Sequence, residues 1–189
     1  MNLPNKLTVF RVILIPVFLS FYLLEQIPNN YLWALVVFAA AALTDTLDGI
    51  IARKYGLVTD FGKLMDPLAD KLLVVSALVC ILQGSAVSIL CLILIISREF
   101  LVTSIRLLAA GKGTVIAADL WGKLKTIVQM VWICLVLLEK FFYLNQGHYY
   151  WWTILLEYVE MVLFVAMVGL TVLSGANYCW KNRRLFEDT

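Results

Sequence analysis

Four aspartates lie close together in residues 45–70, a segment that reads DTLDGIIARKYGLVTDFGKLMDPLAD. Asp45 and Asp48 are three residues apart, so on a helix they would share a face. Asp66 and Asp70 are four residues apart and would do the same. Asp45 directly follows the apolar run VVFAAAALT, where an ionisable side chain is costly and indicates a function. Four converging carboxylates would repel one another and lose hydration, so protons or cations must compensate for their charge.

Divalent cations are the simplest compensation for such a cluster. The segment offers only oxygen ligands and contains no Cys or His, which favours hard ions such as Mg²⁺ or Mn²⁺ over zinc. Single aspartates also have structural interpretations: Asp66, which precedes Pro67, has the sequence of a helix N-cap. The four together, at this spacing, favour a metal site.

The composition shows what kind of molecule must position these side chains. The chain has 189 residues, of which 62% are hydrophobic and 15% charged, and its mean hydropathy is +0.90. Soluble domains have about 45–50% apolar and about 25% charged residues, so a water-soluble enzyme and a disordered chain are excluded.

The length indicates a single domain over residues 1–189, and the net charge of +2 gives no reason to expect nucleic acid as a partner. The four cysteines have no CxxC spacing and are expected to be buried hydrophobes.

A membrane-spanning helix needs about 20 mostly apolar residues. Six segments approach this length, so we predict an all-α integral membrane protein with six transmembrane helices. The third segment is short, and we expect its helix to continue into the polar residues before it. The predicted spans are Leu7–Leu24, Tyr31–Ile51, Pro67–Leu82, Ala86–Ala109, Leu120–Leu138 and Tyr150–Leu173.

Lysine and arginine gather in alternate loops, which is typical of the cytoplasmic side of a membrane protein. The loops between the second and third and between the fourth and fifth spans are basic, as is the C-terminal end, whereas the opposite loops hold only Lys140. Both termini and the aspartates are therefore predicted to be cytoplasmic, and His148 lies on the other side. A divalent-cation transporter would need carboxylates across the whole membrane, but all four aspartates fall near one face.

The aspartates belong to a longer pattern. Asp45-x-x-Asp48-Gly49-x-x-Ala52-Arg53, eight further residues and Gly62-x-x-x-Asp66-x-x-x-Asp70 resemble the signature of the CDP-alcohol phosphatidyltransferases, with every fixed position present. The opening residues Asn2-Leu3-Pro4-Asn5 and the triplet Arg98-Glu99-Phe100 are similar to the bacterial phosphatidylglycerophosphate synthases of that family. The stretch GKGTVIAADLWGKLKT at residues 111–126 is similar to the same branch.

The resemblance implies a reaction and a set of functional residues. The phosphatidyl group of CDP-diacylglycerol would pass to sn-glycerol 3-phosphate, giving phosphatidylglycerophosphate and CMP in anionic phospholipid synthesis. Two divalent ions would be held by the four aspartates, with Asp70 also acting as the general base. The CDP-donor site would contain Gly49, Ala52, Arg53 and Gly62, with Thr8 and Arg11 reaching the donor phosphates from the first span.

The resemblance also implies a homodimer in a bacterial plasma membrane, with its active site facing the cytoplasm. Two other acceptors remain open within the family: phosphatidylglycerol, used by cardiolipin synthases of this type, and the inositol head group of phosphatidylinositol-type enzymes. The stretch from Arg98 to Thr126 favours glycerol phosphate by resemblance. Arg11 has an alternative interpretation, because an arginine in a first span can extend to the lipid head groups.

A glycerol phosphate acceptor requires a basic pocket. Arg98 lies deep in the fourth predicted span, and Arg106 follows eight residues later, about two turns away on roughly the same face. Two such guanidinium groups could clamp a phosphate, so we predict that they bind the acceptor phosphate. Lys123 is a further predicted ligand, ahead of Lys125. Glu99 is expected to point elsewhere on the helix and not to pair with Arg98.

Overall fold

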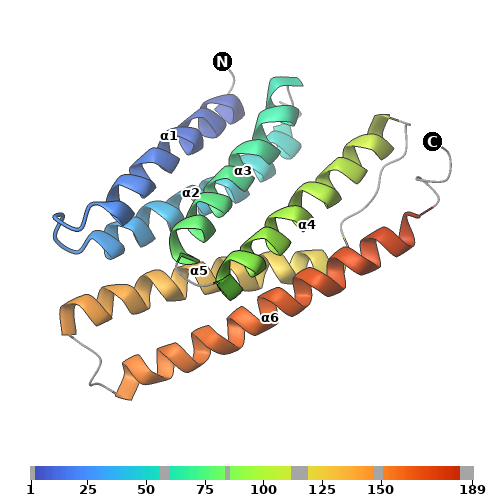
Figure 1. Ribbon diagram of the computed structural model, residues 1–189. Helices are drawn as coiled ribbons and strands as arrows, with labels where there is room; N and C mark the ends of the chain where they lie inside the picture. Colours follow the sequence, from blue (N-terminus) through green and yellow to red (C-terminus); the bar gives the residue numbers. More distant parts are fainter. Residues whose placement is uncertain (1–2, 56–59, 84–85, 112–118, 147–150, 184–189) are drawn as a thin grey trace. The chain divides into compact units, whose positions relative to one another are not determined.

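The computed structural model describes residues 3–55, 60–83, 86–111, 119–146 and 151–183. Within these ranges, the side chains of residues 3–8, 45–55, 60–67, 70, 86–87, 110 and 146 lie outside the described part. The described residues form six α-helices (Figure 1), which confirms the all-helical prediction. The helices are α1 Leu3–Leu23, α2 Asn30–Tyr55, α3 Asp60–Ile81, α4 Ala86–Gly111, α5 Leu120–Gln146 and α6 Trp151–Lys181.

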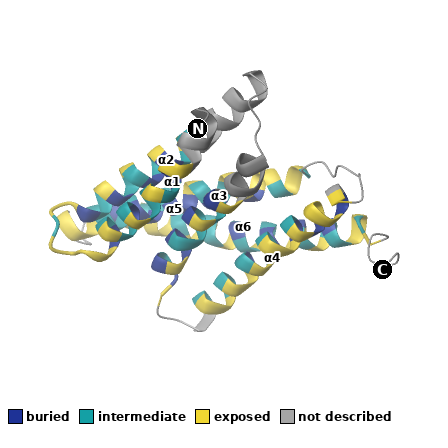
Figure 2. Ribbon diagram, turned by 90° about the horizontal axis from the view of Figure 1, so that it is seen from above, coloured by how far each residue is buried: buried dark blue, intermediate teal, exposed yellow. Residues whose placement is uncertain are grey.

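Three of these helices are long and apolar enough to cross a membrane: residues Ser88–Ala109 of α4, Leu120–Asn145 of α5 and Trp151–Lys181 of α6. Shorter apolar stretches occupy Val9–Leu23, Asn30–Thr44 and Lys71–Ile81, within the first three predicted spans. Exposed residues recur along α4 and α6 (Figure 2), and many are large and apolar, such as Leu90 and Val162. Apolar side chains on the outside of a helix are typical of a surface that faces lipid rather than water.

The third helix begins earlier than the apolar pattern alone predicts. It starts at Asp60 instead of Pro67, which confirms that the short third span continues into the polar segment before it. Asp66 is therefore in the second turn of α3 and is not the N-cap of that helix. The interpretation of Asp66 as a helix N-cap is therefore wrong.

The chain divides into two compact units, which we describe separately. The first contains Met1–Ile81 and Ile133–Glu157, and the second contains Leu82–Trp132 and Tyr158–Thr189. Both α5 and α6 contribute residues to each unit, and a single domain over residues 1–189 stays a prediction.

In the first unit, α1 packs against both α2 and α3. The rings of Phe18 and Phe38 join α1 to α2 with centroids 5.9 Å apart, and both side chains are fully buried. The Tyr22 hydroxyl donates to the carbonyl oxygen of Cys80 at 3.0 Å, which ties α1 to α3. Because α1 contacts both neighbours, it fixes the two helices that carry the aspartates.

In the second unit, an apolar cluster joins α4 to α6. Val102 and Ile105 of α4 and Tyr178 of α6 are buried together, with Cys179 packed against them. The rings of Trp132 and Phe164 add a contact between α5 and α6 at 5.5 Å. This packing holds α6 against α4 and α5, the two helices that carry the predicted acceptor ligands.

Candidate active site

The backbone places the aspartates on two helices of the first unit. Asp45 and Asp48 belong to α2, and Asp66 and Asp70 belong to α3, so the helical spacing assumed for both pairs is confirmed. Their side chains lie outside the described residues, as do those of the donor-site positions Gly49, Ala52, Arg53, Gly62 and Thr8. Among the side chains that the structure does describe, no three His, Cys, Asp or Glu converge on a metal position.

Arg11 is the predicted donor ligand whose side chain is described. It lies on α1 in the same unit as the aspartates, and none of its surface is exposed. A guanidinium is almost never fully buried unless its charge is compensated. This burial contradicts the alternative that Arg11 extends to the lipid head groups, and it agrees with an anionic environment inside the first unit.

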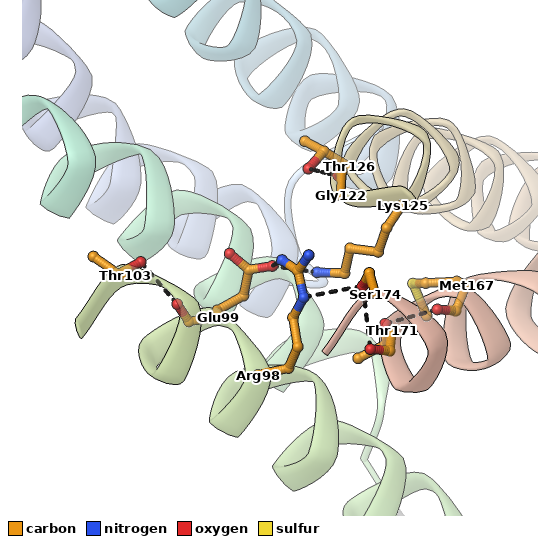
Figure 3. A network of polar contacts seen from close by, with 9 residues as sticks. All are labelled: Arg98, Glu99, Thr103, Gly122, Lys125, Thr126, Met167, Thr171 and Ser174. Atoms are coloured by element: carbon orange, nitrogen blue, oxygen red, sulfur yellow. Dashed lines mark hydrogen bonds and ion pairs between the residues drawn. The ribbon is translucent and has the colours of Figure 1, made fainter. Parts of the chain in front are cut away.

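In the second unit, Arg98 lies at the centre of a polar network. Its Nη1 atom donates to Oε1 of Glu99 at 3.0 Å, and its Nε atom donates to Oγ of Ser174 on α6 at 3.1 Å (Figure 3). Only 11% of the Arg98 side chain is exposed. The prediction that Glu99 points away from Arg98 is therefore wrong. Adjacent helical residues diverge by about 100°, but both side chains are long enough to turn toward the same neighbour on α5.

That neighbour is Lys125. Its ammonium group donates to the same Glu99 oxygen at 2.6 Å, and the lysine side chain is 1% exposed (Figure 3). One carboxylate thus pairs with two cations, which leaves the trio with a net charge of +1. Lys123 lies about 200° away from Lys125 around α5. Its side chain is exposed and makes no hydrogen bond or ion pair with the described residues. The structure therefore brings Lys125 to Arg98, and it does not bring Lys123 there.

Two glycines flank the Arg98 side chain. A Cβ atom on Gly122 of α5 would lie 3.1 Å from Nη2 of Arg98, and a Cβ atom on Gly175 of α6 would lie 3.2 Å from its Cγ. Both separations are shorter than ordinary van der Waals contact, so glycine is what lets α5 and α6 approach the arginine. Gly122 and Gly175 thus serve the packing of Arg98 inside the unit.

This packing predicts opposite results for two Gly→Ala substitutions on α6. Gly175→Ala is expected to destabilise the protein by about 1 kcal/mol. The added methyl group would press on Cγ of Arg98, an atom close to the arginine backbone that has little freedom to move. Gly169→Ala meets no atom within 4 Å and is expected to stabilise the protein by about 0.5–1 kcal/mol, since alanine favours helix. Thermal unfolding of both variants in the same detergent makes the comparison. Equal stabilisation by both would show that Arg98 is not confined at Gly175.

Arg106 is held by α6 as well. Its Nε atom donates to the Tyr178 hydroxyl at 3.3 Å, and its guanidinium carbon lies 5.7 Å from the centre of the Tyr178 ring. Arg106 is exposed, whereas Tyr178 is buried. The prediction that Arg98 and Arg106 share a face of α4 is confirmed in that both contact α6.

The start of α5 is also tied to α6. Asp119 directly precedes α5. Its backbone carbonyl oxygen accepts a hydrogen bond from the backbone N–H of Lys123. Its carboxylate accepts hydrogen bonds from Asn177 and, at 3.3 Å, from Lys181. Sequence reasoning missed these contacts. The available signal was a polar stripe at helical spacing on an otherwise apolar helix: Thr171, Ser174, Asn177, Tyr178 and Lys181.

The second unit therefore presents a cationic site with a fixed geometry. Two cations, Arg98 and Lys125, pair with the Glu99 carboxylate, and hydroxyl groups of α6 accept hydrogen bonds from the guanidinium groups of Arg98 and Arg106. Such a net positive charge, partly shielded from water, suits an anion with several oxygen acceptors, such as a phosphate.

Comparison with known proteins identifies the family. The family model for CDP-alcohol phosphatidyltransferase matches residues 1–173. A Bacillus subtilis (strain 168) protein named CDP-diacylglycerol–glycerol-3-phosphate 3-phosphatidyltransferase is 42% identical, over 96% of this chain and 95% of its own length. A Rickettsia typhi protein of the same name is 38% identical over 94% of each chain. A Mycobacterium tuberculosis H37Rv protein named probable phosphatidylglycerophosphate synthase is 38% identical over 94% of this chain and 79% of its own.

The match spans both the aspartate-bearing helices and the arginines of α4. It confirms the resemblance carried by the aspartate pattern, and the names of the relatives agree with the similarity to the bacterial branch. The chain belongs to the CDP-alcohol phosphatidyltransferase family.

Proposed function

We propose that this protein transfers the phosphatidyl group of CDP-diacylglycerol to sn-glycerol 3-phosphate, releasing CMP. The observation that carries the proposal is the agreement among relatives that span nearly the whole chain and are named for this reaction. In the reaction, an acceptor hydroxyl oxygen bonds to the phosphorus of the phosphatidyl group. The bond from that phosphorus to the oxygen of CMP breaks, and the hydroxyl proton passes to a base.

Asp45, Asp48, Asp66 and Asp70 are the proposed metal ligands. The donor set fits Mg²⁺ or Mn²⁺, because it is made of oxygen alone and comes in pairs one helical turn apart on α2 and α3. Two bound ions would neutralise the pyrophosphate of the donor and the developing charge on CMP. Asp70 is the proposed general base that accepts the proton of the acceptor hydroxyl.

The donor site is proposed to combine residues of α1, α2 and α3. Gly49, Ala52 and Gly62 leave room for CDP to approach the backbone, and Arg53 binds its phosphate groups. Thr8 and Arg11 reach the donor from α1, and the burial of Arg11 supports its part in this set. The acyl chains of the donor stay in the surrounding lipid.

The acceptor phosphate is proposed to bind at Arg98 and Arg106. The hydrogen bonds of both arginines to α6 support this assignment, because they hold the guanidinium groups in fixed orientations. Lys123 stays a proposed ligand because it is a basic residue at the predicted cytoplasmic start of the fifth span. The ion pair of Lys125 with Glu99 supports a part for Lys125 in setting the charge beside Arg98.

The membrane arrangement is part of the same proposal. The three apolar stretches of α1, α2 and α3 would complete six spans with both termini and the active site on the cytoplasmic side of a bacterial plasma membrane. Each enzyme would be a homodimer, as the family resemblance implies.

The test is an acceptor assay with purified protein in detergent. CMP release would be followed with CDP-diacylglycerol and either sn-glycerol 3-phosphate, phosphatidylglycerol or inositol phosphate, each with Mg²⁺, with Mn²⁺ and with a chelator. We expect release with glycerol 3-phosphate alone, abolished by the chelator. Release only with phosphatidylglycerol or inositol phosphate would replace the acceptor and keep the metal site. No release from folded protein would return the aspartates to the role of an ion path.

A further inference from the structure

Two hydroxyl groups of α6 contact the two arginines proposed to bind the acceptor. Ser174 accepts the Nε–H of Arg98 at 3.1 Å, and Tyr178 accepts the Nε–H of Arg106 at 3.3 Å. Ser174 and Tyr178 are four residues apart, so both hydroxyls lie on the same face of α6. One helix thus orients both guanidinium groups.

The two contacts use the same atom of each arginine and leave the terminal nitrogens for other partners. In Arg98, Nη1 pairs with Glu99. In Arg106, neither terminal nitrogen has a hydrogen-bond partner among the residues that the structure describes. A guanidinium recognises a phosphate through parallel N–H groups. A hydroxyl that occupies Nε therefore directs the remaining N–H groups without consuming them.

Both hydroxyls belong to rigid surroundings. Ser174 is 2% and Tyr178 is 3% exposed, and the Tyr178 ring packs against Val102 and Ile105. Ser174 donates its own proton to the carbonyl oxygen of Thr171 at 3.2 Å, which turns its lone pairs toward Arg98. Arg106, by contrast, is exposed and has many rotamers to lose, so its buried partner decides its orientation.

We propose that Tyr178 and Ser174 are positioning residues for the acceptor: they orient Arg106 and Arg98 to receive the phosphate of glycerol 3-phosphate. The proposal rests on the proposed function of the two arginines. Both residues follow residue 173, where the family match ends, so the match itself assigns them no role. Neither hydroxyl touches the acceptor in this proposal; each acts through its arginine.

Tyr178→Phe tests the proposal, because it keeps the ring and removes only the hydroxyl. We expect KM for glycerol 3-phosphate to rise about three- to tenfold, with kcat and KM for CDP-diacylglycerol changed less than about twofold. Inorganic phosphate, as a competitor of the acceptor, should lose inhibition by the same factor. The matched control is Tyr158→Phe on the same helix, because Tyr158 is exposed and has no polar contact among the described residues.

A double-mutant cycle separates this proposal from the one on which it rests. In an Arg106→Ala background, Tyr178→Phe should add no further rise in KM for glycerol 3-phosphate. If Arg106→Ala raises that KM and Tyr178→Phe does not, positioning is overturned while the acceptor site stands. If Arg106→Ala leaves it unchanged, the acceptor role of Arg106 fails, and the role of Tyr178 fails with it.

A purely structural role for Tyr178 would lower kcat or the yield of folded protein and leave both KM values unchanged, which would also overturn the proposal.

Should Tyr178→Phe not fold, Ser174→Ala applies the same test through Arg98. Its expected result is again a rise confined to KM for glycerol 3-phosphate, and its control is Ser104→Ala at an exposed position of α4. An unchanged KM in Ser174→Ala would contradict the proposal.

Discussion

Asp70→Asn is expected to lower CMP release from CDP-diacylglycerol and glycerol 3-phosphate by at least about a hundredfold. Asparagine keeps the size of the side chain and fits the continuous helix α3 that surrounds residue 70. It cannot accept the proton of the acceptor hydroxyl, and it is a weaker ligand for a divalent ion. Initial rates at saturating substrate and metal measure the loss.

The matched control for Asp70→Asn is Asp60→Asn, which makes the same substitution at the first residue of α3, outside the aspartate pattern. Asp60→Asn should retain wild-type rates within about twofold, because Asp60 does not belong to the aspartate pattern that is proposed to bind the metal ions. Equal losses in both variants would show that the rate reports on α3 as a whole. Full activity of Asp70→Asn would remove Asp70 from the catalytic residues.

Glu99→Gln is expected to destabilise the second unit by about 3 kcal/mol, because it leaves two buried cations without their carboxylate partner. The Lys125 side chain is 1% exposed, and its ammonium group pairs with Glu99 at 2.6 Å. Arg98 pairs with the same oxygen. All three side chains lie within apolar stretches long enough to cross a membrane, where an uncompensated cation is costly. Thermal or denaturant unfolding in detergent measures the loss.

A second substitution identifies the cause of that loss. Adding Lys125→Met to Glu99→Gln removes the stranded cation at nearly constant volume, so much of the lost stability should return. Glu25→Gln, in the exposed connection between α1 and α2, is the control for the loss of a carboxylate charge alone. If Lys125→Met deepens the destabilisation, the Glu99 carboxylate is not the partner that makes the buried lysine tolerable.

Much of the fold could be predicted from hydropathy, because apolar runs of spanning length form helices whatever their neighbours are. The six described helices contain the six predicted spans apart from a residue or two at some ends. The boundaries differ most where segments that contain polar residues continue a helix: α3 begins at Asp60, α5 extends to Gln146 and α6 extends to Lys181. Hydropathy cannot detect such extensions, because a helix can continue through polar residues beyond the apolar segment that hydropathy detects.

The pairing of side chains could be predicted less well. Sequence spacing indicated that Arg98 and Arg106 share a face, which helical geometry alone determines. It failed for Glu99, because the partner that turns this carboxylate lies 26 residues away on another helix. Lys123 and Lys125 are the same type of residue, two positions apart. The way α5 is turned about its axis where it packs leaves Lys123 exposed and Lys125 buried.

The sequence by itself determined the family, the helical spacing of the aspartates and the positions of the basic residues, because these depend on residue type and local periodicity. Only the tertiary structure decided that Gly122 and Gly175 flank Arg98 and that Ser174 and Tyr178 hold the arginines of α4. These contacts join helices that are distant in the chain. Their geometry depends on how closely and at what rotation the helices pack, which no local pattern encodes.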